Sequence, residues 1–427
     1  MKKFFEWMEK YFVPIAAKIG SQRHLVAIRD GFVTIMPLII AGSFAVLINN
    51  LPWEAYQNFM SSVLPANWKD FGGVIYDGSF TIMSILIVAT IAYHLAKGYD
   101  KDGVGAAVIS IGSFFILYPK TPMQLADNLG FNSNYLGSTG LFIAIIVALV
   151  ATEIYVRLVG NPKLVIKMPD GVPPAVSRSF AGLLPSIIVL VIAGALRMMF
   201  VAIGIDNVFE SLFLTIQKPL EGLVGSFGGM LILILFQQLL WFFGIHGSNI
   251  IAPIVNAVLL PLTLANTTAL QNGQIPQNIV NSQFLDSYVN MGGSGTTIAL
   301  LIAIFIVGRR SKQEMMIAKL GIAPACFNIN EPVIFGMPLV LNPVYFIPFI
   351  LAPLASASIA YGLTLIGFVP AVSIVANWVT PPILGAVIST GSLTGGLVAL
   401  ICLAVSVLIY IPFVVISSRK ALEVEGL

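Results

Sequence analysis

Glu331 is the residue of this sequence that most directly suggests chemistry. Between Leu320 and Ser418, a stretch of 99 residues, it is the only Asp, Glu, Lys or Arg. A charge inside an apolar membrane segment costs about 2.5 to 3.5 kcal/mol on insertion scales, so a residue of this kind usually serves a function. A lone carboxylate can accept a proton, either as a general base in a reaction or as the carrier of a coupled proton.

The segment 321–343 around Glu331 does not have the composition of a spanning helix. It contains four prolines, three asparagines and two glycines, and proline breaks the helical hydrogen-bond ladder. Non-helical backbone at membrane depth persists only inside protein or along a wet cavity. We therefore predict a re-entrant hairpin over 321–343, with Asn328, Asn330 and a buried Glu331 near its tip. The alternative is a cytoplasmic loop in which Glu331 is solvated.

His246 lies in a second polar cluster, which ends an apolar run at 241–249. The other two histidines, His24 and His94, lie beside cationic residues near predicted helix ends, where an interfacial role is sufficient. For His246 its Gly, Ser and Asn neighbours favour a site, and packing in the core is the alternative.

The run 290–297 contains three glycines and opens a further apolar stretch. Glycines can let backbone N–H groups approach a ligand, as in the broken helices of transporters, and close helix packing explains them equally well. Trp241 and Trp378 are the only tryptophans of the second half, and their faces could stack on sugar rings or anchor at the lipid interface. The candidate substrate-binding residues are Asn328, Asn330, Trp241, Trp378, Gly247, Asn249 and Ser294.

Asp286 is the only charged residue between Gly222 and Gly308. It falls in the polar segment 266–287, which we expect to be an outer loop. In such a loop a carboxylate is solvated, so we assign Asp286 no special role.

The elements that must position these residues are membrane helices. The chain has 427 residues, of which 57% are hydrophobic and 10% charged, against about 25% charged in ordinary soluble domains. Apolar runs of about 20 residues, the length that crosses a bilayer, recur along it. We predict an all-α polytopic membrane protein with about ten transmembrane helices. The predicted spans are 30–50, 72–96, 103–118, 139–157, 178–203, 226–244, 249–265, 288–308, 344–368 and 395–417.

The positive charges predict the orientation of these spans. With the N-terminus in the cytoplasm, 18 of the 22 Lys and Arg residues fall in inside segments, as the positive-inside tendency requires. We therefore expect a multi-pass protein of a bacterial plasma or inner membrane, with both termini cytoplasmic. Segments 1–22, 51–70 and 205–225 alternate apolar and polar residues, and we predict interfacial amphipathic helices there.

Segment 205–225 lies midway along the chain and is the expected connector between two membrane halves. Residues 1–204 would form a scaffold and dimer-interface domain. Residues 226–427 would form the sugar-binding transport domain, which contains the hairpin. In the first half, Glu153 and Arg157 are spaced to pair along one helix.

Composition also argues against several function classes. The net charge is only +3, which does not suggest a nucleic-acid partner. Cys326 and Cys402 have no CxxC or metal-ligand spacing, so we expect small buried apolar side chains there. No metal site and no cofactor is predicted.

Over nearly its whole length the sequence resembles the membrane-embedded IIC component of the phosphoenolpyruvate-dependent sugar phosphotransferase system, in its lactose, cellobiose and diacetylchitobiose branch. The stretch Asn330-Glu-Pro-Val-Ile-Phe-Gly336 is the most specific match. The other matching segments are Ser21-Gln-Arg-His-Leu-Val-Ala-Ile-Arg-Asp30, Pro173-Pro-Ala-Val-Ser-Arg178, Gly244-Ile-His-Gly247 and Gly292-Gly-Ser-Gly295.

The resemblance implies a homodimer in which an interface domain carries a mobile sugar-binding domain. It implies that the imported sugar is phosphorylated at the cytoplasmic side by a phosphocysteine on a IIB protein. It further implies that Glu331 and His246 approach the hydroxyl to be phosphorylated, with Asn330, Trp241 and Trp378 as weaker matches near the sugar.

A fused IIB domain would need an exposed cysteine of low pKa in a soluble domain. Neither Cys326 nor Cys402 has that setting, so we expect IIB to be a separate chain and the phosphotransferase to be shared between two polypeptides. The resemblance narrows the substrate to β-linked disaccharides, with diacetylchitobiose and cellobiose favoured over lactose. Two alternatives stay open: a proton-coupled secondary sugar transporter, and a receptor that binds sugar without transport.

Overall fold

The computed structural model describes most of the 427 residues. The described ranges are 6–7, 10–11, 13–51, 53–119, 133–164, 166, 180–309, 311–337 and 339–425. The segment 173–178 and parts of the predicted N-terminal helix 1–22 lie outside these ranges.

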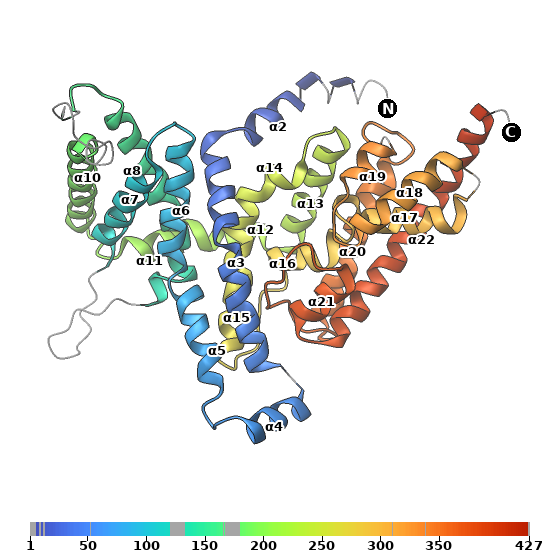
Figure 1. The fold of residues 1–427 in the computed structure, drawn as a ribbon, viewed down its shortest axis with the longest axis horizontal. Helices are drawn as coiled ribbons and strands as arrows, with labels where there is room; N and C mark the ends of the chain where they lie inside the picture. Colours follow the sequence, from blue (N-terminus) through green and yellow to red (C-terminus); the bar gives the residue numbers. More distant parts are fainter. Residues whose placement is uncertain are drawn as a thin grey trace, which may run out of the picture. The chain divides into compact units, whose positions relative to one another are not determined.

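Within the described ranges the chain is helical, as predicted, and contains no strand (Figure 1). Four of its elements are π-helical turns and three are 3₁₀ turns. The longer α-helices are α2 Val13–Gly20, α3 Arg23–Asn50, α4 Glu54–Val63, α5 Lys69–Tyr76, α6 Met83–Lys97, α7 Gly103–Leu117, α8 Leu141–Val159, α10 Leu183–Ala202, α13 Phe227–Phe242, α14 Gly247–Ile254, α15 Leu260–Gln271, α17 Thr297–Val307, α18 Lys312–Ala325, α20 Phe346–Leu365, α21 Pro382–Thr390 and α22 Leu393–Glu425. The shorter elements are α11 Val208–Leu212, α12 Lys218–Val224, α16 Ser282–Phe284, α19 Glu331–Gly336, η2 Asp77–Thr81, η3 Ser133–Tyr135, η4 Ser138–Gly140, η5 Phe213–Gln217, η6 Val255–Leu259, η7 Leu285–Val289 and η8 Ser294–Thr296.

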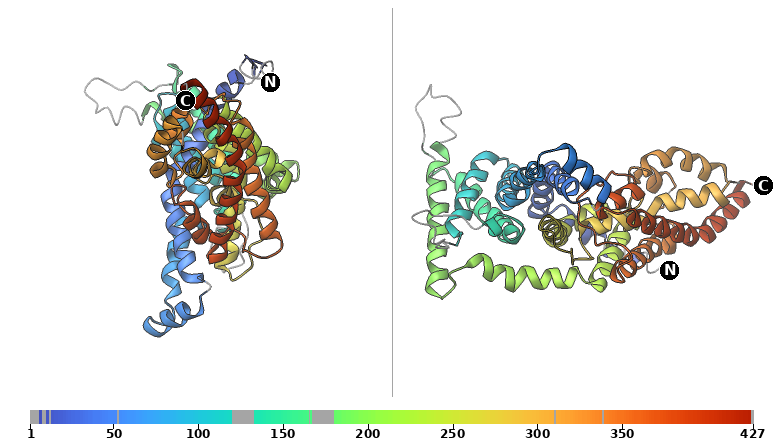
Figure 2. Two further views of the ribbon diagram at one scale, coloured as in Figure 1. Left: turned by 90° about the vertical axis from the view of Figure 1, so that its right-hand side faces the viewer. Right: turned by 90° about the horizontal axis from the view of Figure 1, so that it is seen from below.

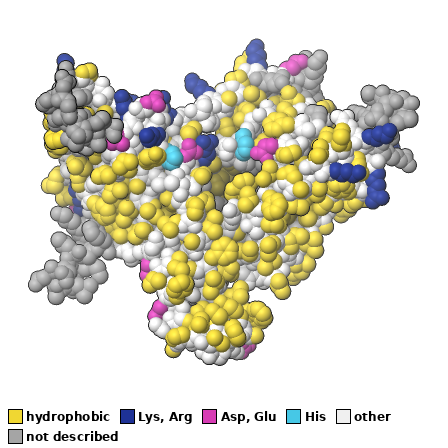
Figure 3. All heavy atoms as spheres, viewed as in Figure 1, with side chains coloured by type: hydrophobic (Ala, Val, Ile, Leu, Met, Phe, Trp, Pro, Cys, Tyr) yellow, Lys and Arg dark blue, Asp and Glu magenta, His cyan; other side chains and the backbone are white. Residues whose placement is uncertain are grey.

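Seven helices in the described part are long and apolar enough to cross a membrane, or nine if two bent pairs each count as one span. Gly103–Leu117 is a shorter apolar helix. Each of the ten predicted spans coincides with one of these segments. The drawn face is largely hydrophobic (Figure 3), and around α4 the side chains of Trp53, Phe59 and Val63 are all more than 60% exposed. Such a surface is stable where lipid replaces water.

The chain divides into two compact units, one formed by 1–20, 43–73 and 221–427 and the other by 21–42 and 74–220. In the second unit α6, α7 and α8 pack together. At the end of α8, Glu153 pairs with Arg157 at 2.6 Å, as predicted. Glu153 also accepts a hydrogen bond from the Tyr99 hydroxyl at 2.8 Å and lies 3.2 Å from His24 Nε2. His24 therefore ties the start of α3 to this cluster.

The first unit holds the polar segments singled out above. Its core lies between α13, α17, α20 and α22, which pack side by side. Figure 2 shows the long α22, in red, running along the other helices of this unit. Cys402 is fully buried in this core, as predicted. Cys326 is only partly buried, because it lies in the turn that follows α18.

The predicted hairpin is formed by α18 and α19, which pack on each other. Its first helix begins at Lys312, before the predicted start of the hairpin at 321. Pro324 does not interrupt this helix, because it lies in the last turn of α18. Ser311 caps α18 through its Oγ, which accepts from the N–H of Glu314 at 3.3 Å. The turn between the helices includes Asn328 in the left-handed region, with φ of 61°.

Glu314, in the first turn of α18, connects the hairpin by hydrogen bonds to residues of two other helices or their ends. Its buried carboxylate accepts hydrogen bonds from the Tyr345 hydroxyl at 2.9 Å, next to α20, and from the Ser418 hydroxyl at 2.6 Å, on α22. The Tyr345 side chain is buried as well, so neither partner of this hydrogen bond is open to solvent.

We expect Tyr345→Phe to lower the free energy of unfolding by about 1 to 3 kcal/mol, because one oxygen of the buried carboxylate loses its donor. Thermal unfolding of the purified protein measures this effect. Tyr361→Phe, which makes the same change at a partly exposed position of α20, is the control. Equal melting temperatures for the two variants would show that the bond to Glu314 contributes no stability.

Candidate functional site

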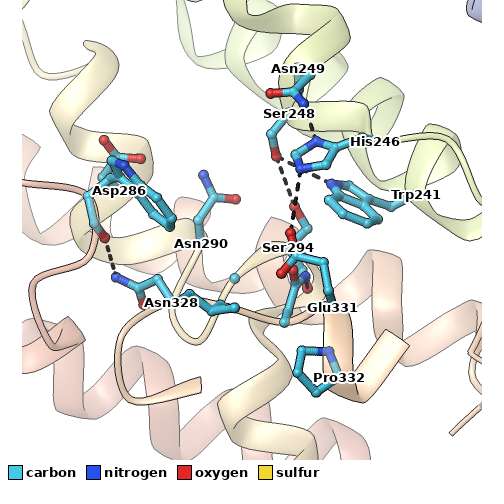
Figure 4. Close-up of a pocket in the computed structure, with 14 residues that line it drawn as sticks. Trp241, His246, Ser248, Asn249, Asp286, Asn290, Ser294, Asn328, Glu331 and Pro332 are labelled. Atoms are coloured by element: carbon cyan, nitrogen blue, oxygen red, sulfur yellow. Dashed lines mark hydrogen bonds and ion pairs between the residues drawn. The ribbon is translucent and has the colours of Figure 1, made fainter. Parts of the chain in front are cut away.

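The first unit contains a cavity of about 650 Å³ (Figure 4). This volume is within the range of about 300 to 1,000 Å³ found for sites that enclose small ligands. None of its described lining residues is Lys or Arg, so the cavity offers no cation to an anionic ligand. The lining residues are Trp241, His246, Ser248, Asn249, Asp286, Asn290, Gly293, Ser294, Asn328, Ile329, Asn330, Glu331, Pro332 and Trp378.

Glu331 reaches the cavity from the first position of α19, where Pro332 follows it inside the first turn. Proline is tolerated there because that N–H has no partner within the helix. The expectation that Glu331 is buried is wrong: its side chain is 45% exposed. The carboxylate lies at an open part of the cavity wall, where a hydroxyl group of a ligand or of a partner could reach it.

His246 faces Glu331 across this part of the cavity. Its Nε2 lies 3.7 Å from Glu331 Oε1, which is too long for a direct hydrogen bond but close enough for both atoms to contact one hydroxyl oxygen. His246 also caps α14, because its Nδ1 accepts from the N–H of Asn249 at 3.3 Å. A backbone N–H can only donate, so Nδ1 carries no proton and the proton is on Nε2. The imidazole is therefore neutral and points a donor toward Glu331.

Gln237 organises the wall beside His246, although its own side chain is buried. Its amide nitrogen lies within hydrogen-bond distance of Ser248 Oγ at 3.0 Å, Ser294 Oγ at 3.0 Å and Asn290 Oδ1 at 3.1 Å. Trp241 adds a hydrogen bond from its indole N–H to Ser248 at 3.3 Å. The network joins α13, the start of α14 and the loop before α17. The sequence analysis did not single out Gln237, because glutamines such as Gln237 and Gln238 can have many roles in an apolar helix.

The glycine run 292–295 forms this loop. Gly292, Gly293 and Gly295 all have positive φ, which glycine adopts without steric cost. A Cβ on Gly293 would lie 2.5 Å from Cγ of Asn330, and Asn330 donates to the Ser294 carbonyl at 3.1 Å. Close packing, one of the two explanations offered for these glycines, is therefore present at Gly293. Gly293 also lines the cavity.

The expectation that Asp286 lies in a solvated outer loop is wrong. After α15 most of the segment 272–277 is exposed, but the chain then turns into the unit, where Asn266 of α15 and Asn281 donate to the Val372 carbonyl at 2.8 and 3.1 Å. The π-helical η7 then carries Asp286 into the cavity wall, and π-helical turns are frequent at functional sites. Figure 4 shows Asp286 on the side of the cavity opposite Trp241 and His246. The cavity therefore holds two carboxylates.

The structure brings eight of the nine predicted site residues into the cavity wall. Gly247 is not among them. A Cβ at this position would lie 2.2 Å from the Gln237 carbonyl oxygen and 2.9 Å from the Trp241 ring, so the glycine allows α14 to start against α13. The lining residues that the sequence did not single out as ligand contacts are Ser248, Asp286, Asn290, Gly293, Ile329 and Pro332.

The two tryptophans that were predicted to bind the substrate differ in how far their rings are exposed. Trp241 is only 3% exposed, and its ring packs on His246 with centroids 4.3 Å apart. Trp378 is 54% exposed and comes from the non-helical segment between α20 and α21. Trp378 therefore offers the more open face for stacking, and Trp241 supports His246.

The fold and the cavity together define a multi-pass helical membrane protein with an internal site for a small polar ligand. The family profile described as "Phosphotransferase system, EIIC" matches residues 29–353. The chain therefore belongs to the EIIC family of the phosphotransferase system, whose members are sugar permeases of the membrane.

Individual relatives match over nearly their full length. The chain is 39% identical to the lichenan permease IIC component of Bacillus subtilis (strain 168), over 100% of this chain and 96% of the relative. It is 36% identical to the cellobiose-specific EIIC component of Geobacillus stearothermophilus, over 100% and 97%. It is similar in structure to the transporter ChbC, the IIC component of the N,N'-diacetylchitobiose-specific phosphotransferase system, with a TM-score of 0.93, 36% identity and 98% and 99% coverage.

Proposed function

We propose that this EIIC protein imports a β-linked disaccharide and presents it for phosphorylation by a separate phospho-IIB protein. The relatives described above are named for lichenan, cellobiose and diacetylchitobiose, which supports a β-linked substrate. A cavity lined by carboxylates, amides, hydroxyls and an exposed tryptophan fits an uncharged sugar. The observation that carries the proposal is the pair of Glu331 and the neutral His246, whose facing atoms can share one hydroxyl.

In the proposed reaction Glu331 acts as the general base. The sugar hydroxyl, the primary one at carbon 6 in our proposal, accepts a hydrogen bond from His246 Nε2–H and gives its proton to Glu331 Oε1. Its oxygen attacks the phosphorus of the phosphocysteine on IIB, so that an O–P bond forms and the S–P bond breaks. The cysteine of IIB leaves as a thiolate. Positioning of the two reactants provides much of the rate in such a step.

The remaining cavity residues would bind and orient the sugar. Trp378 has an open face for stacking, and the carboxylate of Asp286 can accept hydrogen bonds from sugar hydroxyls on the opposite side from His246. Asn249, Ser294 and Asn330 also line the cavity. The described cavity lining contains no Lys or Arg that could hold a phosphorylated sugar, which supports release of the product after the transfer.

We place both termini in the cytoplasm, as the distribution of Lys and Arg favours. We further propose that residues 1–204 form a scaffold through which two copies dimerise, with 205–225 as connector and 226–427 as transport domain. α10 supports an interface in the first part of the chain, because its spanning window is only 17% buried and Val191 and Met198 are 64% and 67% exposed.

The test is import into proteoliposomes that contain the purified protein. With phospho-IIB inside, we expect cellobiose or diacetylchitobiose to accumulate as the sugar phosphate, and a protonophore to leave the rate unchanged. Free sugar that accumulates without IIB and is lost with the protonophore would contradict the proposal and support proton-coupled transport.

A further inference from the structure

Asn328 lines the cavity, but its side-chain amide is bound to the backbone of two other segments. Oδ1 accepts from the N–H of Gly292 at 2.8 Å. Nδ2 donates to the carbonyl of Trp378 at 2.6 Å and to that of Thr380 at 3.0 Å. Figure 4 shows Asn328 turned toward this segment and away from His246. An asparagine amide has two N–H donors, so both are used within the protein.

The conformation of Asn328 fits this role. Its φ is 61°, a left-handed conformation that asparagine adopts far more readily than most residues. In this conformation the hairpin turn reaches both the glycine loop and the turn 377–380. Because both N–H donors of this amide are used, the side chain connects the hairpin turn to the two other segments and has no N–H left for a ligand.

The segment that Asn328 holds is the one that carries Trp378. Upstream, the N–H of Ala376 donates to Gln283 Oε1 at 3.2 Å. Between these two attachments the Asn377 carbonyl accepts from the N–H of Thr380 at 2.8 Å and closes a turn. Trp378 lies in this turn with its side chain half exposed in the cavity wall. Its backbone is therefore fixed from two sides, and the downstream attachment is the side chain of Asn328.

We propose that Asn328 sets sugar affinity as a positioning residue, by holding the backbone of Trp378 so that the indole face meets the sugar. This inference rests on the proposed function, because it takes the cavity to bind a β-linked disaccharide. It assigns Asn328 a role through Trp378 and not a contact with the sugar.

A double-mutant cycle on the purified full-length protein tests the proposal. Asn328→Asp keeps the size, the left-handed preference and the acceptor for Gly292, and it removes both donors to the 378–380 turn. We expect it to weaken cellobiose or diacetylchitobiose binding about tenfold, as the loss of two hydrogen bonds would. In a Trp378→Ala background the same change should weaken binding by less than about twofold, because coupled sites are not additive.

Asn249→Ala is the matched control, since Asn249 is a second cavity asparagine and lies on α14, away from Trp378. We expect it to weaken binding by the same factor in both backgrounds. Asn328→Gly keeps the backbone conformation without the added charge of aspartate and should repeat the result for Asn328→Asp. An equal loss for the Asn328 variants in both backgrounds would overturn the proposal and show direct contact with the sugar.

A second readout needs no sugar. The emission of Trp378, taken as the difference between each protein and its Trp378→Phe counterpart, should shift to longer wavelength in Asn328→Asp as the turn loosens. Unchanged emission would overturn the proposal even if wild-type protein bound neither disaccharide. Absence of sugar binding by the wild type would instead contradict the proposed function.

Discussion

Replacement of Glu331 by Gln is expected to slow IIB-dependent phosphorylation by about 10²- to 10⁴-fold, the usual contribution of a general base. Glutamine preserves the shape of the side chain and can still accept a hydrogen bond, but it cannot take the proton of the attacking hydroxyl. The side chain is 45% exposed, so this change buries no unpaired group. Sugar affinity should therefore stay within about threefold. Equilibrium binding and a single-turnover assay with phospho-IIB measure the two effects separately.

Asp286→Asn is the control for this prediction, because it removes the other carboxylate of the cavity. Asp286 lies on the side opposite His246, so we expect a rise in the dissociation constant and a much smaller change in the rate of phosphorylation at saturating sugar. If Glu331→Gln and Asp286→Asn both lowered binding and rate in the same proportion, Glu331 would be a binding residue and not the base. Full activity of Glu331→Gln would exclude both roles.

Glu331 and His246 could be found from the sequence because each interrupts a long apolar stretch. A single charge among nearly a hundred uncharged residues, or one imidazole in a long apolar stretch, is conspicuous whatever the fold. Eight of the nine predicted site residues line one cavity, although they come from four distant parts of the chain. What the sequence could not give was the exposure of Glu331, which depends on the opening of the cavity beside it.

Asp286 was missed for the opposite reason. Its segment 266–287 is rich in Asn, Gln, Ser and Thr, and a polar segment between two spans is normally a solvated loop. Here the amides of Asn266 and Asn281 bind the Val372 carbonyl, far along the chain, which satisfies their polarity inside the protein. Such partners depend on tertiary contacts, so local patterns could not show that the end of this segment enters the protein. The network around Gln237 is hidden in the same way.

Gly293→Ala is expected to damage both the stability of the protein and its binding of sugar. The new Cβ would lie 2.5 Å from Cγ of Asn330, and φ of 95° at this residue is strained for alanine. Asn330 is only 3% exposed and is bonded to the Ser294 carbonyl, so it has little room to move. We expect the free energy of unfolding to fall by about 2 to 4 kcal/mol and sugar binding to be lost. Thermal unfolding and equilibrium binding measure both.

Gly362→Ala provides the matched control. Gly362 lies inside α20 of the same unit, and a Cβ there meets nothing within 4 Å. This change should leave binding intact and add up to about 1 kcal/mol of stability through helix propensity.

Combining Gly293→Ala with Asn330→Gly removes the three atoms nearest the new methyl. The pair should regain part of the lost stability without regaining sugar affinity, since Asn330 itself lines the cavity. Wild-type stability and binding in Gly293→Ala alone would show that the glycine loop tolerates a side chain at this position. The loop would then not pack as tightly against Asn330 of the hairpin turn as we infer.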